Sequence, residues 1–269
     1  MSPLRTVLLF ALLIVVLAAI VVGWRKGSAP AVFETPIATY PALPASCRNL
    51  AFEGDDFIVC AADPATQRIA VAHLDRSGLP LKSLEALADQ MQFDFAMNAG
   101  MYHEDNSPVG LYVENGHEFA LLNTDDADGN FFMKPNGVFF VDRSGKPGVL
   151  ETSAFAIANP QVESATQSGP MLVIDGNIHP RFEPDGASRY IRNGVGLDDA
   201  GRAVFAISRS PVSLGKFARL FRDALGCKNA LFFDGAISAL HDGKRYLVGG
   251  GYPAGPMVAV QAKVPSTAQ

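Results

Sequence analysis

The stretch SLGKFARLFRDALGCKNALFFDGAIS, residues 213–238, carries a helix signal, a buried strand and a polar turn in direct succession. Ser213 is a favourable N-cap residue, and Gly226 is a favourable helix stop. Between them the large apolar side chains recur at helical spacing: Leu214, Phe217, Phe221 and Leu225. Residues 231–233 are all apolar and end in an Asp-Gly turn. The stretch therefore predicts an amphipathic helix that leads into a core strand with polar residues at its end.

Strand signals dominate the rest of the chain. Residues 109–114 and 117–122 flank Asn115-Gly116, a strong hairpin signal. Residues 57–61 and 68–73 form a second expected pair, joined through Asp63-Pro64. Further apolar runs end at turn sequences: residues 137–142, 171–174, 194–197 and 203–208.

A second helix is expected within residues 81–91. Hairpins thus outnumber crossover connections. This predicts an α+β fold with a largely antiparallel or mixed sheet and a few packed helices.

Residues 6–24 contain no charged side chain. At 1.5 Å per residue, this run makes roughly 28 Å of helix, close to the hydrocarbon thickness of a bilayer. We therefore expect residues 1–26 to form an uncleaved transmembrane anchor, with cleavage as a signal peptide as the alternative. Residues 27–46 contain four prolines and predict an extended linker. Residues 47–264 then form one domain.

Basic residues flank the anchor on both sides, so they do not fix its orientation. Cys47 and Cys60 favour export, because a disulfide between them would persist only in an oxidising compartment. Cys227 is left over and fits a buried thiol. We expect a single-pass inner-membrane protein with its domain in the periplasm, or a secreted periplasmic form if the segment is cleaved.

The net charge of −5 and the pI near 5.5 argue against a nucleic-acid partner. With 48% hydrophobic and 18% charged residues, the chain can bury one sizeable core. The histidines have no metal-ligand spacing, so no metal site is predicted. The sequence leaves any cofactor open.

Four segments place polar or glycine-flanked residues at predicted strand ends, where sites are commonly built. They are FAMNAGMY at 95–102, TQSGPML at 166–172, RYIRNGVG at 189–196 and FFDGAIS at 232–238. Each segment alone is weak evidence for a functional site, since an Asp-Gly strand end, for example, is usually only a turn. In this order they resemble the phosphodiester glycosidases, the group that includes the mammalian enzyme uncovering mannose 6-phosphate on lysosomal proteins.

Three motifs carry the resemblance. The family's Asn-Gly-Gly-Phe looks like Asn98-Ala99-Gly100-Met101, and its Arg-x-x-x-Gly is similar to Arg192 through Gly196. Its Leu-Asp-Gly-Gly-Gly-Ser is similar to Phe233 through Ser238, with Ala236-Ile237 in place of two glycines. The sequence most resembles the bacterial branch associated with exopolysaccharide biosynthesis.

The resemblance implies hydrolysis of a sugar 1-phosphodiester or a related glycosidic linkage in a cell-envelope or exported glycan. Arg192 would grip the phosphate through its forked guanidinium, and Asp234 would serve as base or nucleophile. The other residues implied in binding the sugar or phosphate are Asn98, Gly100, Tyr102, Ser168, Gly169, Arg189, Asn193, Gly235 and Ser238.

Two other functions fit the same residues. The chain could be a non-catalytic glycan-binding or exopolysaccharide assembly factor on the same fold. It could also cleave an ordinary glycosidic bond, which requires a second carboxylate facing Asp234. Glu104 and Asp198 are the residues to examine for that role.

Overall fold

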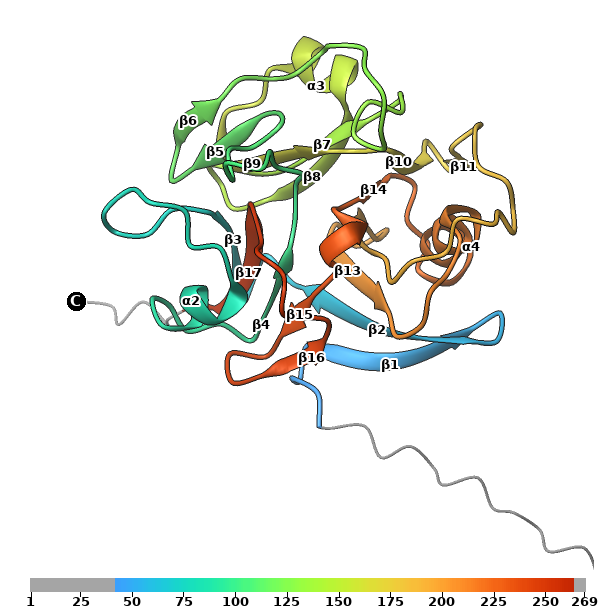
Figure 1. The fold of residues 1–269 in the computed structure, drawn as a ribbon, viewed down its shortest axis with the longest axis horizontal. Coiled ribbons are helices and arrows are strands. Elements are labelled where there is room, and N and C mark those ends of the chain that lie inside the picture. Colours follow the sequence, from blue (N-terminus) through green and yellow to red (C-terminus); the bar gives the residue numbers. More distant parts are fainter. Residues whose placement is uncertain (1–41, 264–269) are drawn as a thin grey trace, which may run out of the picture. The chain divides into compact units, whose positions relative to one another are not determined.

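The computed structural model describes residues 42–263, which form three antiparallel sheets and a few short helices (Figure 1). This agrees with the expected α+β fold of hairpins. The expected anchor, residues 1–26, lies outside the described residues. Within the described part of the chain, no helix is long and apolar enough to cross a membrane.

The first sheet has seven strands, in the order β1 (Cys47–Phe52), β2 (Asp55–Ala62), β13 (Ala203–Ser208), β12 (Asn193–Leu197), β14 (Ala230–Phe232), β10 (Met171–Ile174) and β11 (Asn177–Ile178). The second has five, in the order β16 (Tyr246–Val248), β15 (Leu240–His241), β4 (Phe95–Asn98), β17 (Met257–Ala262) and β3 (Gln67–Ala72). The third also has five, in the order β6 (His117–Ala120), β5 (Tyr112–Glu114), β9 (Val162–Ser168), β7 (Gly137–Asp142) and β8 (Pro147–Glu151).

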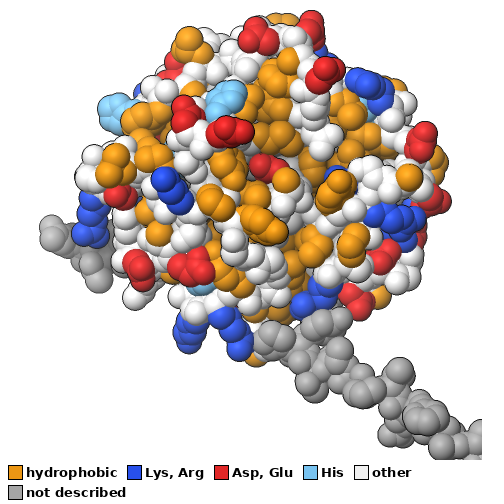
Figure 2. Space-filling model, in the orientation of Figure 1, with side chains coloured by type: hydrophobic (Ala, Val, Ile, Leu, Met, Phe, Trp, Pro, Cys, Tyr) orange, Lys and Arg blue, Asp and Glu red, His pale blue; other side chains and the backbone are white. Residues whose placement is uncertain are grey.

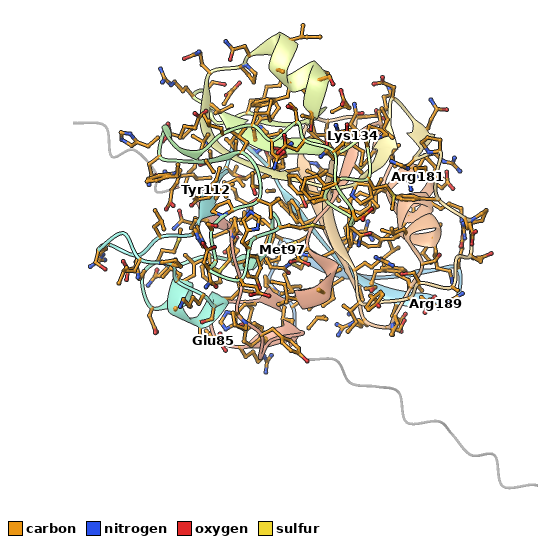
Figure 3. The ribbon with its side chains drawn as sticks, turned by 45° about the horizontal axis from the view of Figure 1, so that its top comes forward. Glu85, Met97, Tyr112, Lys134, Arg181 and Arg189 are labelled. Atoms are coloured by element: carbon orange, nitrogen blue, oxygen red, sulfur yellow. A yellow bond between two sulfur atoms is a disulfide. The ribbon has the colours of Figure 1, made fainter. Side chains whose placement is uncertain are left out.

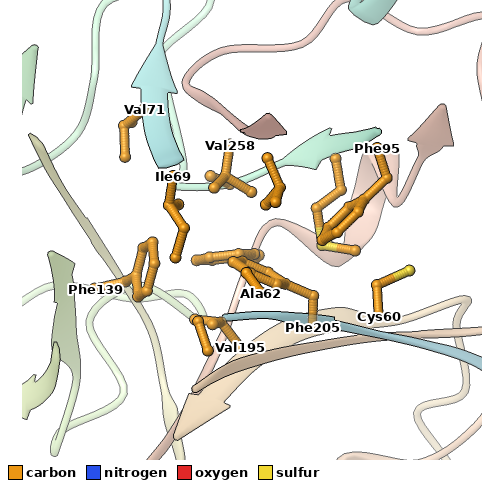
Figure 4. Close-up of a cluster of buried hydrophobic side chains, with 14 of the residues drawn as sticks. Cys60, Ala62, Ile69, Val71, Phe95, Phe139, Val195, Phe205 and Val258 are labelled. Carbon is orange, nitrogen blue, oxygen red and sulfur yellow. The ribbon is translucent and has the colours of Figure 1, made fainter. Parts of the chain in front are cut away.

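All three sheets turn one face toward a common core. Figure 4 shows side chains from the first, second and third sheets meeting there, among them Phe205, Phe95 and Phe139. The ring of Phe205 meets the other two rings edge-on, at centroid distances of 5.5 and 5.7 Å. One hydrophobic core therefore holds the three sheets together.

Each sheet buries its other face under one short helix. Helix α4 (Leu214–Arg219), continued by the π-helical turn η1 (Leu220–Ala224), covers the first sheet. Helix α2 (Leu84–Ala88) covers the second, and α3 (Thr152–Ala158) covers the third. Many strands are therefore apolar on both faces, which explains their continuous hydrophobic runs.

The local sequence signals for the ends of α4 and for the Asn115-Gly116 hairpin are confirmed. Ser213 caps α4 by accepting a hydrogen bond from Lys216 N, and Gly226 ends the helical segment with φ of +66°. The Asn115-Gly116 hairpin joins β5 to β6, with both residues at positive φ. The second expected helix is shorter than the pattern, running from Leu84 to Ala88.

The expected pairing of residues 57–61 with residues 68–73 is wrong. β2 pairs with β1 and β13 in the first sheet, whereas β3 pairs with β17 in the second. The turn that contains Asp63-Pro64 carries the chain from one sheet to the other. Turn residues mark where a strand ends, but they do not choose its partner.

The disulfide between Cys47 and Cys60 is confirmed, and it joins two residues paired directly across β1 and β2. Cys227 is free and buried, as expected. In the chain-entropy model, a bridge over 13 residues stabilises the fold by about 3 kcal/mol. The bridge thus fastens β1, an edge strand, to the sheet.

Candidate active site

The side-chain amide of Asn98, at the end of β4, connects three separate segments. Its Nδ2 donates to Asp234 O at 2.7 Å. Its Oδ1 accepts from Ala239 N at 2.8 Å and from Asn193 Nδ2 at 2.9 Å. Asn98 is 1% exposed, so these bonds form away from water. One buried amide therefore holds the backbone at both ends of the 234–239 loop. It also connects β4 of the second sheet to Asn193 of the first.

Asn193 and Ser238 extend this network. Asn193 Nδ2 also donates to Asn98 O at 2.8 Å. The Ser238 hydroxyl donates to Ile191 O at 2.8 Å and lies 3.1 Å from Asn193 Oδ1. The polar groups of these side chains form hydrogen bonds within the protein. They position the loop, and direct contact between them and a substrate stays a prediction.

Asp234 follows β14 and begins the 3-10 turn η2 (Gly235–Ile237). Its N–H donates to Ala99 O at 3.0 Å, and its Oδ1 accepts from Ala236 N at 3.0 Å. The carboxylate is only partly exposed, and burial raises its pKa above the usual value, although the Ala236 bond opposes this. Asp234 is therefore a stronger base than an ordinary surface aspartate.

Tyr102 lies near this carboxylate. Burial raises the pKa of its phenol first, and the negative charge of Asp234 raises it further. Its hydroxyl donates to Pro253 O. Gly255 lies against its ring, since a Cβ there would come within 2.3 Å of the ring. The ring is thus held beside Asp234 by the segment that precedes β17.

Arg192 lies just before β12 and is 2% exposed. Its Nε donates to Val212 O at 2.8 Å, and its Nη2 donates to Ser188 O at 2.9 Å. Within residues 42–263 it forms no ion pair, and its Nη1 makes no hydrogen bond. Burial lowers its pKa to about 10, so it remains charged at neutral pH. The site thus holds a buried cation that no carboxylate of the described residues neutralises.

Two aromatic rings contact the guanidinium. Its Cζ lies 5.3 Å from the centroid of Phe232 and 5.6 Å from that of Tyr190. Such contacts favour the charged form of arginine. Tyr190 is 57% exposed even though its backbone pairs with Val212.

The strand register brings Arg192 and Asp234 to the same end of two adjacent strands, β12 and β14. Gly194 pairs with Phe232, and the ladder continues through the hydrogen bond from Phe233 N to Asn193 O. Arg192 and Asp234 are the next residues along the two chain segments, and the Arg192 guanidinium lies over the Phe232 ring. The predicted cation and carboxylate therefore lie at the ends of two adjacent strands of the first sheet.

The positions of the other predicted site residues are described by their packing and exposure. Gly100 is buried against β9, where a Cβ would lie 2.2 Å from Thr166 Oγ1. Ser168 is fully buried, and Gly169 is buried beside Phe131 and Asn136. Gly235 is partly exposed next to the Phe232 ring.

Arg189 is exposed, and Figure 3 shows it on the same side of the molecule as Arg181. Hydrogen bonds from Lys216 and Ser210 lower the pKa of Asp55, and the charge of Arg189 adds a smaller lowering effect, which places Arg189 near that carboxylate.

The two candidate second carboxylates differ in position. Asp198 follows β12, whereas Arg192 precedes it, so the strand separates them by roughly 20 Å. Asp198 also caps its own turn and pairs with Arg202. It does not face Asp234. Glu104 is exposed on the loop after Tyr102.

Charges of both signs are scattered over the face shown in Figure 2, around a more hydrophobic middle. No basic stripe crosses this face. Within the described residues, no group of three or more His, Cys, Asp or Glu side chains could hold a metal ion.

Sequence reasoning missed the residues that surround Arg192: Ser188, Tyr190, Val212 and Phe232. The sequence does carry a signal for Tyr190 and Phe232. Tyr190 lies two positions before Arg192 and Phe232 two positions before Asp234, so on a strand each would share a face with that residue. Val212 gives no such signal, because its backbone carbonyl reaches Arg192 from 20 residues away.

The family model described as phosphodiester glycosidase matches residues 91–245. The chain is also 38% identical over 210 residues to the uncharacterized protein YigE of Escherichia coli (strain K12), covering 75% of this chain and 80% of the relative. The chain therefore belongs to the phosphodiester glycosidase family.

Solved structures share the fold. One is the auto-inhibited catalytic domain of zebrafish N-acetylglucosamine-1-phosphodiester alpha-N-acetylglucosaminidase, with a TM-score of 0.56, 12% identity, and coverage of 81% of this chain and 82% of that chain. Another is a hypothetical protein from Synechocystis, with a TM-score of 0.57, 13% identity, and coverage of 81% and 61%. At these identities the likeness shows the fold alone.

The network predicts that Asn98→Ala destabilises the fold by about 3 kcal/mol, because three hydrogen bonds are lost and their buried partners are left unpaired. Urea denaturation of both proteins measures the difference. Asn130→Ala is the control: Asn130 is exposed, and its side chain makes no hydrogen bond within residues 42–263. Equal stability of the two variants would contradict the role given to Asn98.

Proposed function

We propose that this protein hydrolyses a sugar 1-phosphodiester, with Arg192 binding the phosphate and Asp234 acting at the anomeric carbon. The observation that carries this proposal is the buried guanidinium of Arg192. Among the described residues it has no carboxylate partner and no hydrogen bond at Nη1, and it precedes β12, the strand next to the one that Asp234 follows. A phosphate diester supplies the single negative charge that such a cation lacks.

The chemistry divides between these two side chains. The bond between C1 and the phosphate oxygen breaks, and the phosphate monoester leaves with the bonding electrons. Arg192 stabilises the charge that develops on this leaving group. A water oxygen forms the new bond to C1 while Asp234 takes its proton, or Asp234 itself attacks C1 first and water releases the sugar afterwards.

The protonation states suit these roles. Arg192 keeps its charge at neutral pH, because even the lowered pKa of about 10 lies well above it. Asp234 has a raised pKa, which makes its carboxylate a better proton acceptor than a fully solvated one. Because phosphate is already a good leaving group, a strong general acid is less necessary than in ordinary glycoside hydrolysis.

We also propose that the folded part acts on a cell-envelope or exported glycan, outside the cytoplasm and held by residues 1–26. The uncharged run at 6–24 and the Cys47–Cys60 disulfide support this location. Protease added to spheroplasts that express the full chain should digest the folded part while a cytoplasmic marker survives. A protected chain would contradict the proposal, and a soluble, shortened chain would indicate a cleaved signal.

Asp234→Asn should lower kcat by orders of magnitude on a simple sugar 1-phosphodiester such as methyl α-glucosyl phosphate, because the amide cannot act as base or nucleophile. The fold should persist. Ionisation of Asp234 is disfavoured in the folded state, so its contribution to stability falls as pH rises through the raised pKa. At neutral pH the asparagine variant should therefore be at least as stable as the wild type.

The matched control is Asp223→Asn, an exposed aspartate on η1 that pairs with Arg222. It should retain full activity. The wild-type rate should fall as pH drops through the pKa of Asp234, at a pH above the usual aspartate range. If Asp234→Asn cleaves the diester as fast as the wild type, Asp234 is only a turn residue.

Arg192→Lys should raise KM for the phosphodiester by at least tenfold. Lysine keeps the charge but cannot reproduce the fork that bonds Val212 O and Ser188 O while leaving a donor free. Steady-state kinetics on the diester and on a neutral glucoside would measure the effect, with exposed Arg202→Lys as the control. An equal loss on both substrates would show that Arg192 is structural.

A further inference from the structure

The segment 249–256, which joins β16 to β17, crosses the part of the second sheet that borders the candidate site (Figure 1). In the order of that sheet, β15 and β4 lie between these two strands. β16 ends opposite Leu240, the first residue of β15, and β17 begins opposite Asn98, the last residue of β4. The segment therefore passes over the ends of β15 and β4, where the 234–239 loop enters the sheet.

Contacts at both ends of this segment fasten it beside Asp234. At its start, Gly249 packs so tightly that a Cβ there would collide with Ser238 O. At its end, Pro256 O accepts a hydrogen bond from Ala99 N at 2.8 Å, and Ala99 O accepts one from Asp234 N at 3.0 Å. The segment thus borders the 234–239 loop at Ser238 and again, through Ala99, at Asp234 itself.

The middle of the segment exposes an aromatic ring. Residues 249–251 are three glycines with φ of +68°, +99° and +90°, a conformation that suits glycine, and they carry no side chain that could cover the next residue. Tyr252 follows and is 70% exposed. Its side chain forms no hydrogen bond and contacts no other ring within residues 42–263. On its other side, Pro253 O accepts a hydrogen bond from the Tyr102 hydroxyl, which holds the backbone there.

Tyr252 differs in this respect from Tyr190, a second exposed tyrosine, whose ring contacts the Arg192 guanidinium. An exposed ring on a fastened segment is a surface that a ligand can cover at little cost in conformational entropy. Covering it removes apolar area from water, which favours binding. The Tyr252 ring therefore offers binding energy that no contact within the described residues uses.

A sugar ring matches such a surface. One face of a hexopyranose carries C–H groups that pack against aromatic rings, while its hydroxyl groups point outward and remain solvated. We propose that Tyr252 is a sugar-binding residue, whose ring packs on the sugar that presents C1 to Asp234. This inference rests on the proposed function. It gives the sugar an exposed contact, whereas Asn98, Asn193 and Ser238 are buried and bonded to one another.

Steady-state kinetics on methyl α-glucosyl phosphate test this contact. Tyr252→Ala should raise KM about fivefold or more and leave kcat within about twofold, because the ring binds substrate and transition state alike. Tyr252→Phe retains the ring and should keep KM within about twofold of the wild type, whereas Tyr252→Leu should resemble Tyr252→Ala. Ile157→Ala on α3 removes another exposed apolar side chain and is the matched control, with both constants unchanged. A KM that rises as much in Tyr252→Phe as in Tyr252→Ala would overturn the inference, because the hydroxyl rather than the ring would then make the contact.

A binding measurement separates this inference from the proposed hydrolysis. Saturation-transfer NMR on the Asp234→Asn protein, irradiated at its aromatic protons, should show transfer to the glucose ring protons of the intact diester. Adding Tyr252→Ala should reduce this transfer by about half or more, since the other aromatic residues of the site remain. If the wild type cleaves the diester but Tyr252→Ala changes neither KM nor the transfer, this inference fails alone. If the wild type cleaves no diester but Tyr252→Ala still reduces the transfer, the proposed hydrolysis fails and the sugar contact stands.

Discussion

The amide of Asn98 is the interaction on which the candidate site depends. β4 and β12 belong to different sheets, and the loop that carries Asp234 leaves the first sheet and enters the second. Asn98 bonds the backbone at both ends of that loop and the side chain of Asn193. Aspartate could not make the same set, because it has no donor for Asp234 O.

The common core explains why polar side chains gather at this point. Strands such as β2, β7 and β13 are buried on both faces, one against the core and one under a helix. Polar groups inside such strands would be buried without partners. Asn98, Asn193 and Asp234 lie at strand ends, where they meet. The site is thus a consequence of how the three sheets join.

Sequence reasoning succeeded where the determinant is local. The Asn115-Gly116 turn, the Ser213 cap and the Asp-Gly end of β14 each depend on a few neighbouring residues. The pairing of β2 with β13 rather than β3 depends on contacts across more than 140 positions, and no local pattern encodes it. For the same reason Arg192 could be singled out as a candidate cation, whereas its carbonyl partners could not.

Among the residues that the structure describes, Asp234 and Arg192 form no ion pair. An ion pair with Arg192 would lower the pKa of the carboxyl, yet burial raises it. The guanidinium instead bonds Val212 O and Ser188 O and lies over Phe232. These contacts hold the guanidinium without an ion pair, at a cost in stability because both charges are partly desolvated. A bound phosphate would offset the charge on Arg192 and, being negative, would raise the pKa of Asp234 further. The substrate itself would then strengthen the base that acts on it.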